Sequence, residues 1–79
     1  MTPDREVDAR DLLCPLPVLR ARKALEGMRP GAVLRVLATD AMAAIDLPHF
    51  CREAGHEHLG QTSEGGAQIH LIRRGPRNG

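Results

Sequence analysis

The sequence predicts a two-layer α/β (α+β) sandwich, in which a four-stranded mixed sheet carries two helices on one face. Three observations predict this fold. Strand-like and helix-like segments follow one another in the order β-α-β-α-β-β. Both helix-like segments have one apolar face, so both should lie on the same side of a sheet. The last two strand-like segments flank a glycine turn, which is typical of a hairpin.

The first half of the chain predicts a short strand, a loop and a helix. Residues 6–9 are strand-like, residues 10–13 form a loop, and a helical pattern runs from Cys14 to about Gly27. Five residues of this helix share one arc at 100° per residue, as expected for a face turned toward a core: Val18, Ala21, Ala24, Leu25 and Met28. Gly27 and Pro30-Gly31 end the helix.

The second half predicts a buried strand, a second helix and a hairpin. Residues 32–39 are almost continuously apolar, as in a strand inside a sheet. Residues 43–54 have a helical period, but Pro48 favours a later start, with Asp46 as the N-cap and residues 40–45 as a turn. Strands over about 56–62 and 67–73 should meet through Glu64-Gly65-Gly66.

Size and composition indicate one small globular domain. The chain has 79 residues, of which 42% are apolar; it has no Trp, no Tyr and one Phe, so the core must be aliphatic. We expect a core over about residues 6–74 and a flexible tail over 75–79. The formal net charge of +1 gives no overall field that would attract nucleic acid or a membrane.

The two cysteines are expected to be free thiols. A disulfide is the usual interpretation for a small secreted chain. The first ten residues, however, contain no apolar segment of a secretory signal, and no run approaches the roughly 20 apolar residues of a membrane span. We therefore expect the reducing cytoplasm.

The candidate site is Cys14-Pro15-Leu16-Pro17. Proline is tolerated in the first helical turn, which makes Cys14 the expected N-cap, although Ser, Thr, Asp or Asn would cap better by about 1 kcal/mol. The helix dipole would lower the pKa of a thiol at this position and stabilise its anion, while Asp11 would act in the opposite direction. Pro15 and Pro17 should stiffen the turn and leave the Leu16 N–H as the donor to the sulfur. An inert Cys14 and, more weakly, a metal ligand are the alternatives.

Two sequence blocks resemble those of the TusA/SirA-like sulfur-carrier family. The first is VDARDLLCPLPVLRARKAL, with its Cys-Pro-x-Pro at the first helix. The second is TDAMAAIDLPHFCREAGHEHL, whose Asp-Leu-Pro-His-Phe-Cys matches the family's Asp-Ile-Pro-x-Phe-Cys pattern. The similarity extends over residues 7–74. One departure is Asp11, where many relatives have Gly, and Asp tolerates the same left-handed backbone.

The resemblance implies a sulfurtransferase that relays sulfur through one cysteine. Cys14 would accept sulfane sulfur as a persulfide from a cysteine desulfurase or a rhodanese-like donor and pass it to an acceptor protein. The pathways served by the family are tRNA thiolation, molybdenum cofactor assembly and sulfur oxidation. No cofactor, metal or membrane partner is expected, and the protein should be a monomer.

The other polar residues have simpler interpretations. Cys51 should be a small core residue. His56, His58 and His70 are expected on exposed strands, with a zinc cluster as the alternative, and His49 in solvent. Arg20, Arg22 and Lys23 should form a solvated face or a docking patch for an acidic partner or RNA, and the RGPRNG tail has the same two interpretations.

An alternative function is a non-catalytic RNA- or protein-binding module. The predicted topology is similar to the C-terminal domain of a translation initiation factor that contacts ribosomal RNA, but fold similarity alone is a weak argument for function. The low net charge and the lack of stacking aromatic residues argue against RNA binding.

Overall fold

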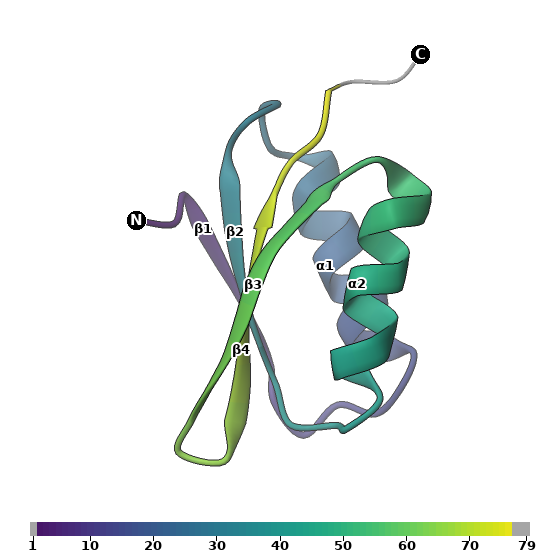
Figure 1. The fold of residues 1–79 in the computed structure, drawn as a ribbon, viewed down its shortest axis with the longest axis vertical. Coiled ribbons are helices and arrows are strands. Elements are labelled where there is room, and N and C mark those ends of the chain that lie inside the picture. The colour runs from purple at the N-terminus through teal and green to yellow at the C-terminus, as the bar shows by residue number, and fades with distance from the viewer. Residues whose placement is uncertain (1, 77–79) are drawn as a thin grey trace.

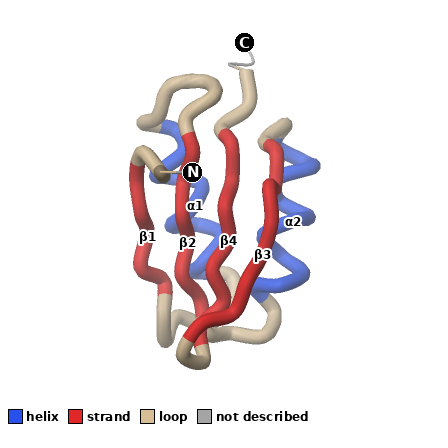
Figure 2. The backbone as a smooth tube through the Cα atoms, turned by 60° about the vertical axis from the view of Figure 1, so that its left-hand side comes forward, coloured by secondary structure: helices blue, strands red, loops and turns tan. Residues whose placement is uncertain are grey.

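The sheet and the two helices form two layers, in the chain order β-α-β-α-β-β that the sequence predicts (Figure 1). The computed structural model describes residues 2–76. The elements are β1 (Arg5–Ala9), α1 (Leu16–Glu26), β2 (Val33–Ala38), α2 (Ala43–Ala54), β3 (Glu57–Glu64) and β4 (Ala67–Arg73). Figure 2 shows both helices behind one face of the sheet, which confirms the predicted sandwich.

The sheet is mixed and has the strand order β1-β2-β4-β3. β1 pairs in parallel with β2, and α1 makes the crossover between them. β4 pairs antiparallel with both β2 and β3. The hairpin turn consists of Gly65 and Gly66, whose φ angles of 57° and 83° are favourable only for glycine.

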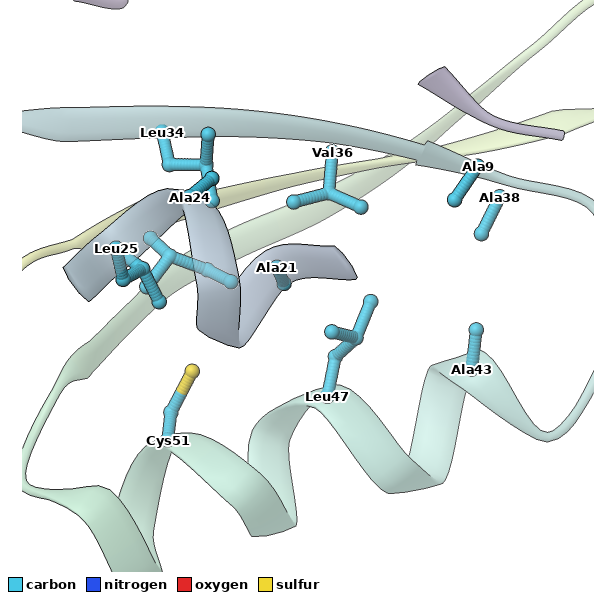
Figure 3. Packing of buried hydrophobic residues seen from close by; sticks show 11 residues of the cluster. Ala9, Ala21, Ala24, Leu25, Leu34, Val36, Ala38, Ala43, Leu47 and Cys51 are labelled. Carbon is cyan, nitrogen blue, oxygen red and sulfur yellow. The ribbon is translucent and has the colours of Figure 1, made fainter. Parts of the chain in front are cut away.

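Small and branched aliphatic side chains fill the space between the layers. Ala21, Ala24 and Leu25 of α1 are buried, as the predicted apolar arc requires. Figure 3 shows three labelled α2 side chains, Ala43, Leu47 and Cys51, pointing toward α1 and the sheet. Leu34, Val36 and Ala38 of β2 belong to the same buried cluster. The cluster is aliphatic apart from Cys51, and Phe50, the one aromatic residue of the sequence, is half-buried and packs against it.

The predicted start of the second helix is wrong. α2 begins at Ala43 and continues through Pro48, whereas the sequence favours a turn up to Ile45 and an N-cap at Asp46. The residue that begins the helix is Asp40, because its Oδ1 accepts the Met42 N–H at 3.1 Å and its carbonyl oxygen accepts the Ala43 N–H at 3.0 Å. Asp46 therefore lies inside the first turn, and its carboxylate is free for another contact.

The C-terminal end is also more ordered than predicted. Gly75, expected in a flexible tail, is buried, and its N–H donates to His56 Nδ1 at 2.9 Å. The Arg74 Nε–H donates to the Leu25 carbonyl at 3.0 Å and so ties the end of β4 to α1. Pro76 is exposed, and residues 77–79 of the predicted tail lie outside the described residues.

Neither helix within residues 2–76 has the length and apolar character that a bilayer crossing requires.

Candidate functional site

The loop that carries Cys14 is fixed to the sheet by backbone hydrogen bonds. Asp11 has a φ of 66°, the left-handed conformation that the sequence predicts at this position. Its N–H donates to Thr39 Oγ1 at 2.9 Å, which links the loop to the end of β2. The Leu12 N–H donates to the Ala9 carbonyl at 3.3 Å. The loop therefore leaves β1 in a defined direction, toward the start of α2.

The Cys14 backbone is bound by the aspartate that begins α2. The Cys14 N–H donates to Asp40 Oδ2 at 2.6 Å, while the other oxygen of the same carboxylate accepts the Met42 N–H. The Cys14–Pro15 peptide bond is cis. One carboxylate thus connects the cysteine loop to α2, and both loops lie at the same end of the molecule (Figure 1).

Cys14 is not the N-cap of α1, which corrects the prediction. The helix begins at Leu16, and Pro15 occupies the N-cap position without a side-chain hydrogen bond. The Leu16 N–H donates to the Leu13 carbonyl at 2.8 Å, so it does not serve the sulfur as expected. Pro15 is exposed, whereas the ring of Pro17 is fully buried. The helix therefore starts two residues beyond the cysteine, at the residue between the two prolines.

The Cys14 thiol instead faces a carboxylate of α2. Cys14 Sγ donates to Asp46 Oδ2 at 2.9 Å. This hydrogen bond raises the pKa of Cys14, and partial desolvation and the negative charges of Asp46 and Asp40 act in the same direction. The direction is opposite to the lowering by the helix dipole that the sequence predicts. The difference arises because Cys14 lies outside α1 and next to two aspartates.

Asp40 and Asp46 are the site residues that sequence reasoning missed. Both were assigned to backbone roles, as part of a turn and as an N-cap. Their involvement depends on the packing of α2 beside the cysteine loop, and their distance along the chain from Cys14 gave no local signal.

The second cysteine has a different environment. Cys51 is buried in the core on the inner face of α2, as predicted (Figure 3). Burial raises the pKa of its thiol to about 11. Both cysteines are free, so the site has one accessible thiol.

The histidines do not lie on exposed strands as expected. His70 is fully buried on the helix-facing side of β4, and its Nδ1 lies 2.8 Å from His58 Nε2. Its Nε2 lies 2.8 Å from Gln68 Oε1, and Gln68 in turn donates to the Asp40 carbonyl at 2.8 Å. Because the Gln68 amide nitrogen is the donor to Asp40, its oxygen must accept, and His70 carries its proton on Nε2.

Both ring nitrogens of His70 are engaged in these hydrogen bonds, so His70 is not placed as a ligand of the alternative zinc cluster. His56 precedes β3 and accepts the Gly75 N–H, so it does not join the other two. Residues 2–76 contain no group of three His, Cys, Asp or Glu side chains arranged to hold a metal ion. His49 is exposed, with Nε2 3.8 Å from Glu53 Oε1.

The basic residues of α1 are exposed. Arg22 lies 3.7 Å from Glu26 in an i,i+4 ion pair, and Arg20 and Lys23 also face solvent. Surface pairs of this kind contribute little to stability. In the RGPRNG segment, Arg74 binds the Leu25 carbonyl, whereas Arg77 lies outside the described residues.

Exposed apolar side chains occur on the segments next to the thiol. The five large apolar residues that are well exposed within residues 2–76 are Leu13, Leu16, Leu19, Met42 and Ile45. Leu13 and Leu16 flank the cysteine in sequence, and Met42 and Ile45 belong to the start of α2, where Asp40 and Asp46 contact it. An accessible thiol therefore lies among apolar surface and two carboxylates.

The family model described as Sulfurtransferase TusA matches residues 5–74. The sulfur carrier protein TusA of Allochromatium vinosum is 44% identical over 71 residues, which cover 90% of this chain and 93% of that protein. The sulfur carrier protein TusA of Pseudomonas entomophila is 42% identical, with coverages of 90% and 89%. The chain belongs to the TusA family.

A solved structure supports the same assignment at the level of the fold. The crystal structure of a SirA-like protein from Desulfitobacterium hafniense superposes with a TM-score of 0.79 and 29% identity, and covers 90% of this chain and 97% of that one. The resemblance found in the sequence is thereby confirmed, and this TusA family member has a role in sulfur transfer.

Proposed function

We propose that this TusA family member carries sulfane sulfur as a persulfide on Cys14. The observation that carries the proposal is the contrast between the two thiols: Cys14 is exposed at the end of a hydrogen-bonded loop, and Cys51 is buried. A carrier needs one thiol that a partner can reach and no second thiol beside it that would displace the sulfur by forming a disulfide.

The transfer needs neither an oxidant nor a reductant. Cys14 Sγ attacks the terminal sulfur of a persulfide on the donor enzyme and loses its proton. The new Cys14 S–S bond forms while the donor's S–S bond breaks, and the donor's cysteine leaves as a thiolate that takes up the proton. In the second transfer, a nucleophile of the acceptor attacks the terminal sulfur, and Cys14 is the leaving thiolate.

The partners follow from this chemistry. The donor would be a protein that generates cysteine persulfide, a cysteine desulfurase or a rhodanese-like enzyme, and the acceptor a further protein with a nucleophilic thiol. The apolar side chains around Cys14 would form the contact with both partners, in turn. We place the protein in the cytoplasm as a monomer, in one of the family's three pathways, with tRNA thiolation as the first to test.

Loading by a cysteine desulfurase tests the proposal. Incubation with the desulfurase and free cysteine should add one sulfur atom, about 32 Da, to the peptide that contains Cys14, and a reducing agent should remove it. Cys51→Ala should load like the parent because residue 51 is buried. If Cys14→Ser gains the same mass, or if the parent gains none, the proposal is wrong.

A further inference from the structure

The hydrogen bond between Cys14 and Asp46 depends on the chemical state of the cysteine. Sγ donates to Asp46 Oδ2, and only a protonated thiol has a hydrogen to donate. A thiolate cannot make this contact. Neither can a persulfide at neutral pH, because hydropersulfides are stronger acids than thiols and the terminal sulfur is then an anion.

The backbone and the side chain of Cys14 are held by separate carboxylates. Asp40 holds the N–H, and this contact does not involve the sulfur. Asp46 alone holds Sγ, and both of these aspartates are half-buried. When sulfur is added, the backbone anchor can persist while the side chain loses its hydrogen bond. The added sulfur is also an anion close to two carboxylates, and like charges at such short range repel.

We propose that Asp46 is a positioning residue that senses whether Cys14 carries sulfur. It holds the unloaded thiol against α2 and repels the loaded persulfide, so that the terminal sulfur turns outward only when there is sulfur to transfer. This inference rests on the proposed function. An acceptor protein could then distinguish the loaded carrier from the empty one. The two forms differ in the position of the Cys14 side chain as well as in the added sulfur atom.

The same arrangement affects reactivity in both states. The empty carrier remains a thiol near neutral pH because Asp46 and Asp40 both disfavour its anion. The same two charges disfavour the Cys14 thiolate that leaves when the loaded carrier is discharged, and a leaving thiol of higher pKa departs more slowly. Asp46 would thus limit side reactions of the empty carrier and slow the loss of sulfur from the loaded one to small thiols.

The test uses Asp46→Asn in the full chain, with Asp11→Asn as the matched control. Asn has the shape of Asp without its charge, and its amide can also donate to an anionic sulfur. Asp11 belongs to the same loop but makes no contact with the sulfur, and Asn tolerates its left-handed backbone. Asp46→Ser provides a second variant without the charge, in case Asp46→Asn folds poorly.

The first measurement is the iodoacetamide rate of the unloaded protein as a function of pH. Only the thiolate reacts. In Asp46→Asn the midpoint of this profile should move to lower pH, with the rate at pH 7 rising roughly tenfold for each pKa unit recovered and the high-pH plateau unchanged. Asp11→Asn should follow the parent. A merely structural role for Asp46 would change the folding midpoint but not the pH midpoint.

The second measurement is the discharge of persulfide that has been loaded chemically with inorganic polysulfide. Loading without an enzyme keeps this test independent of the donor assigned above. The parent should release sulfur to a small thiol several-fold more slowly than Asp46→Asn, because Asp46 disfavours the Cys14 thiolate that leaves. Equal rates of discharge and equal alkylation profiles in parent and variant would overturn the inference, while failure to load from a desulfurase would overturn the proposed function alone.

Discussion

Cys14 and Cys51 differ in the two properties that govern the reactivity of a thiol, its exposure and its pKa. Cys14 is exposed. Cys51 is buried, and burial raises its pKa to about 11. The sequence predicted this contrast because Cys51 lies on an apolar helical stripe. It could not predict the raised pKa of Cys14, which depends on a side chain 32 residues away.

Brief treatment of the native protein with iodoacetamide should therefore label Cys14 well before Cys51. Peptide mass mapping measures the two sites in one sample, and the chain unfolded in denaturant provides the control, in which both should be labelled. Equal labelling in the native protein would contradict the burial of Cys51.

His70 should make the stability of the protein depend on pH. Burial lowers its pKa to about 4, and the neighbouring His58 contributes to this lowering. His58 is itself shifted down by burial. In the unfolded chain histidine titrates near 6.5, so below that pH the unfolded state binds more protons than the folded state. The free energy of unfolding should be at its full value above about pH 6.5 and fall as the pH decreases toward 4.

A urea midpoint measured between pH 7 and pH 5 checks this expectation. The loss should be on the order of 1–2 kcal/mol at pH 5. His70→Gln should flatten the dependence, while His49→Gln, which changes an exposed histidine, should keep the slope of the parent. A parent whose midpoint is constant over this range would contradict the assigned state of the His58–His70 pair.

At the scale of the elements, the two helix starts mark the limit of what the sequence pattern could predict. The apolar arcs of α1 and α2 are confirmed because they depend on the helical period alone. The starts depend on which polar group reaches the first free N–H groups, and at α2 that group belongs to Asp40, not Asp46. Pro48 therefore lies inside α2 and does not mark its beginning.

Pro17 and Pro48 should respond to alanine substitution with opposite signs. Pro17 is fully buried, so Pro17→Ala should lower the free energy of unfolding by about 1–2 kcal/mol through lost packing. Pro48→Ala restores an N–H that can donate to the Ala44 carbonyl, and it should raise stability by about 1 kcal/mol. Urea midpoints of the two variants test the pair, and a destabilised Pro48→Ala would show that its ring matters more than the missing hydrogen bond.

At the scale of the whole molecule, the chain end closes the end of the sandwich opposite Cys14. Gly75 binds His56, Arg74 binds Leu25, and the Gly31 N–H donates to the Arg74 carbonyl at 2.8 Å. The composition from Gly75 onward is typical of a free tail, which is what the sequence predicts there. These contacts join elements that are distant in the chain, and no local pattern indicates them.

Gly75 should tolerate no side chain. A Cβ at this position would overlap the Gly55 carbonyl, whereas a Cβ at Gly60 would meet no atom within 4 Å. Gly75→Ala should cost about 2 kcal/mol of stability, and Gly60→Ala should stay within about 0.5 kcal/mol of the parent. Thermal or urea unfolding distinguishes them, and similar stability of the two variants would contradict the described path of the chain end.

The central claim, that sulfur enters and leaves through Cys14, is tested most directly by counting the sulfur that can be discharged. The desulfurase-loaded protein is separated from the donor and treated with cyanide, which attacks sulfane sulfur and releases it as thiocyanate. The account predicts about one thiocyanate per chain from the parent and from Cys51→Ala, and none from Cys14→Ser. Thiocyanate from Cys14→Ser in the amount released by the parent would contradict it.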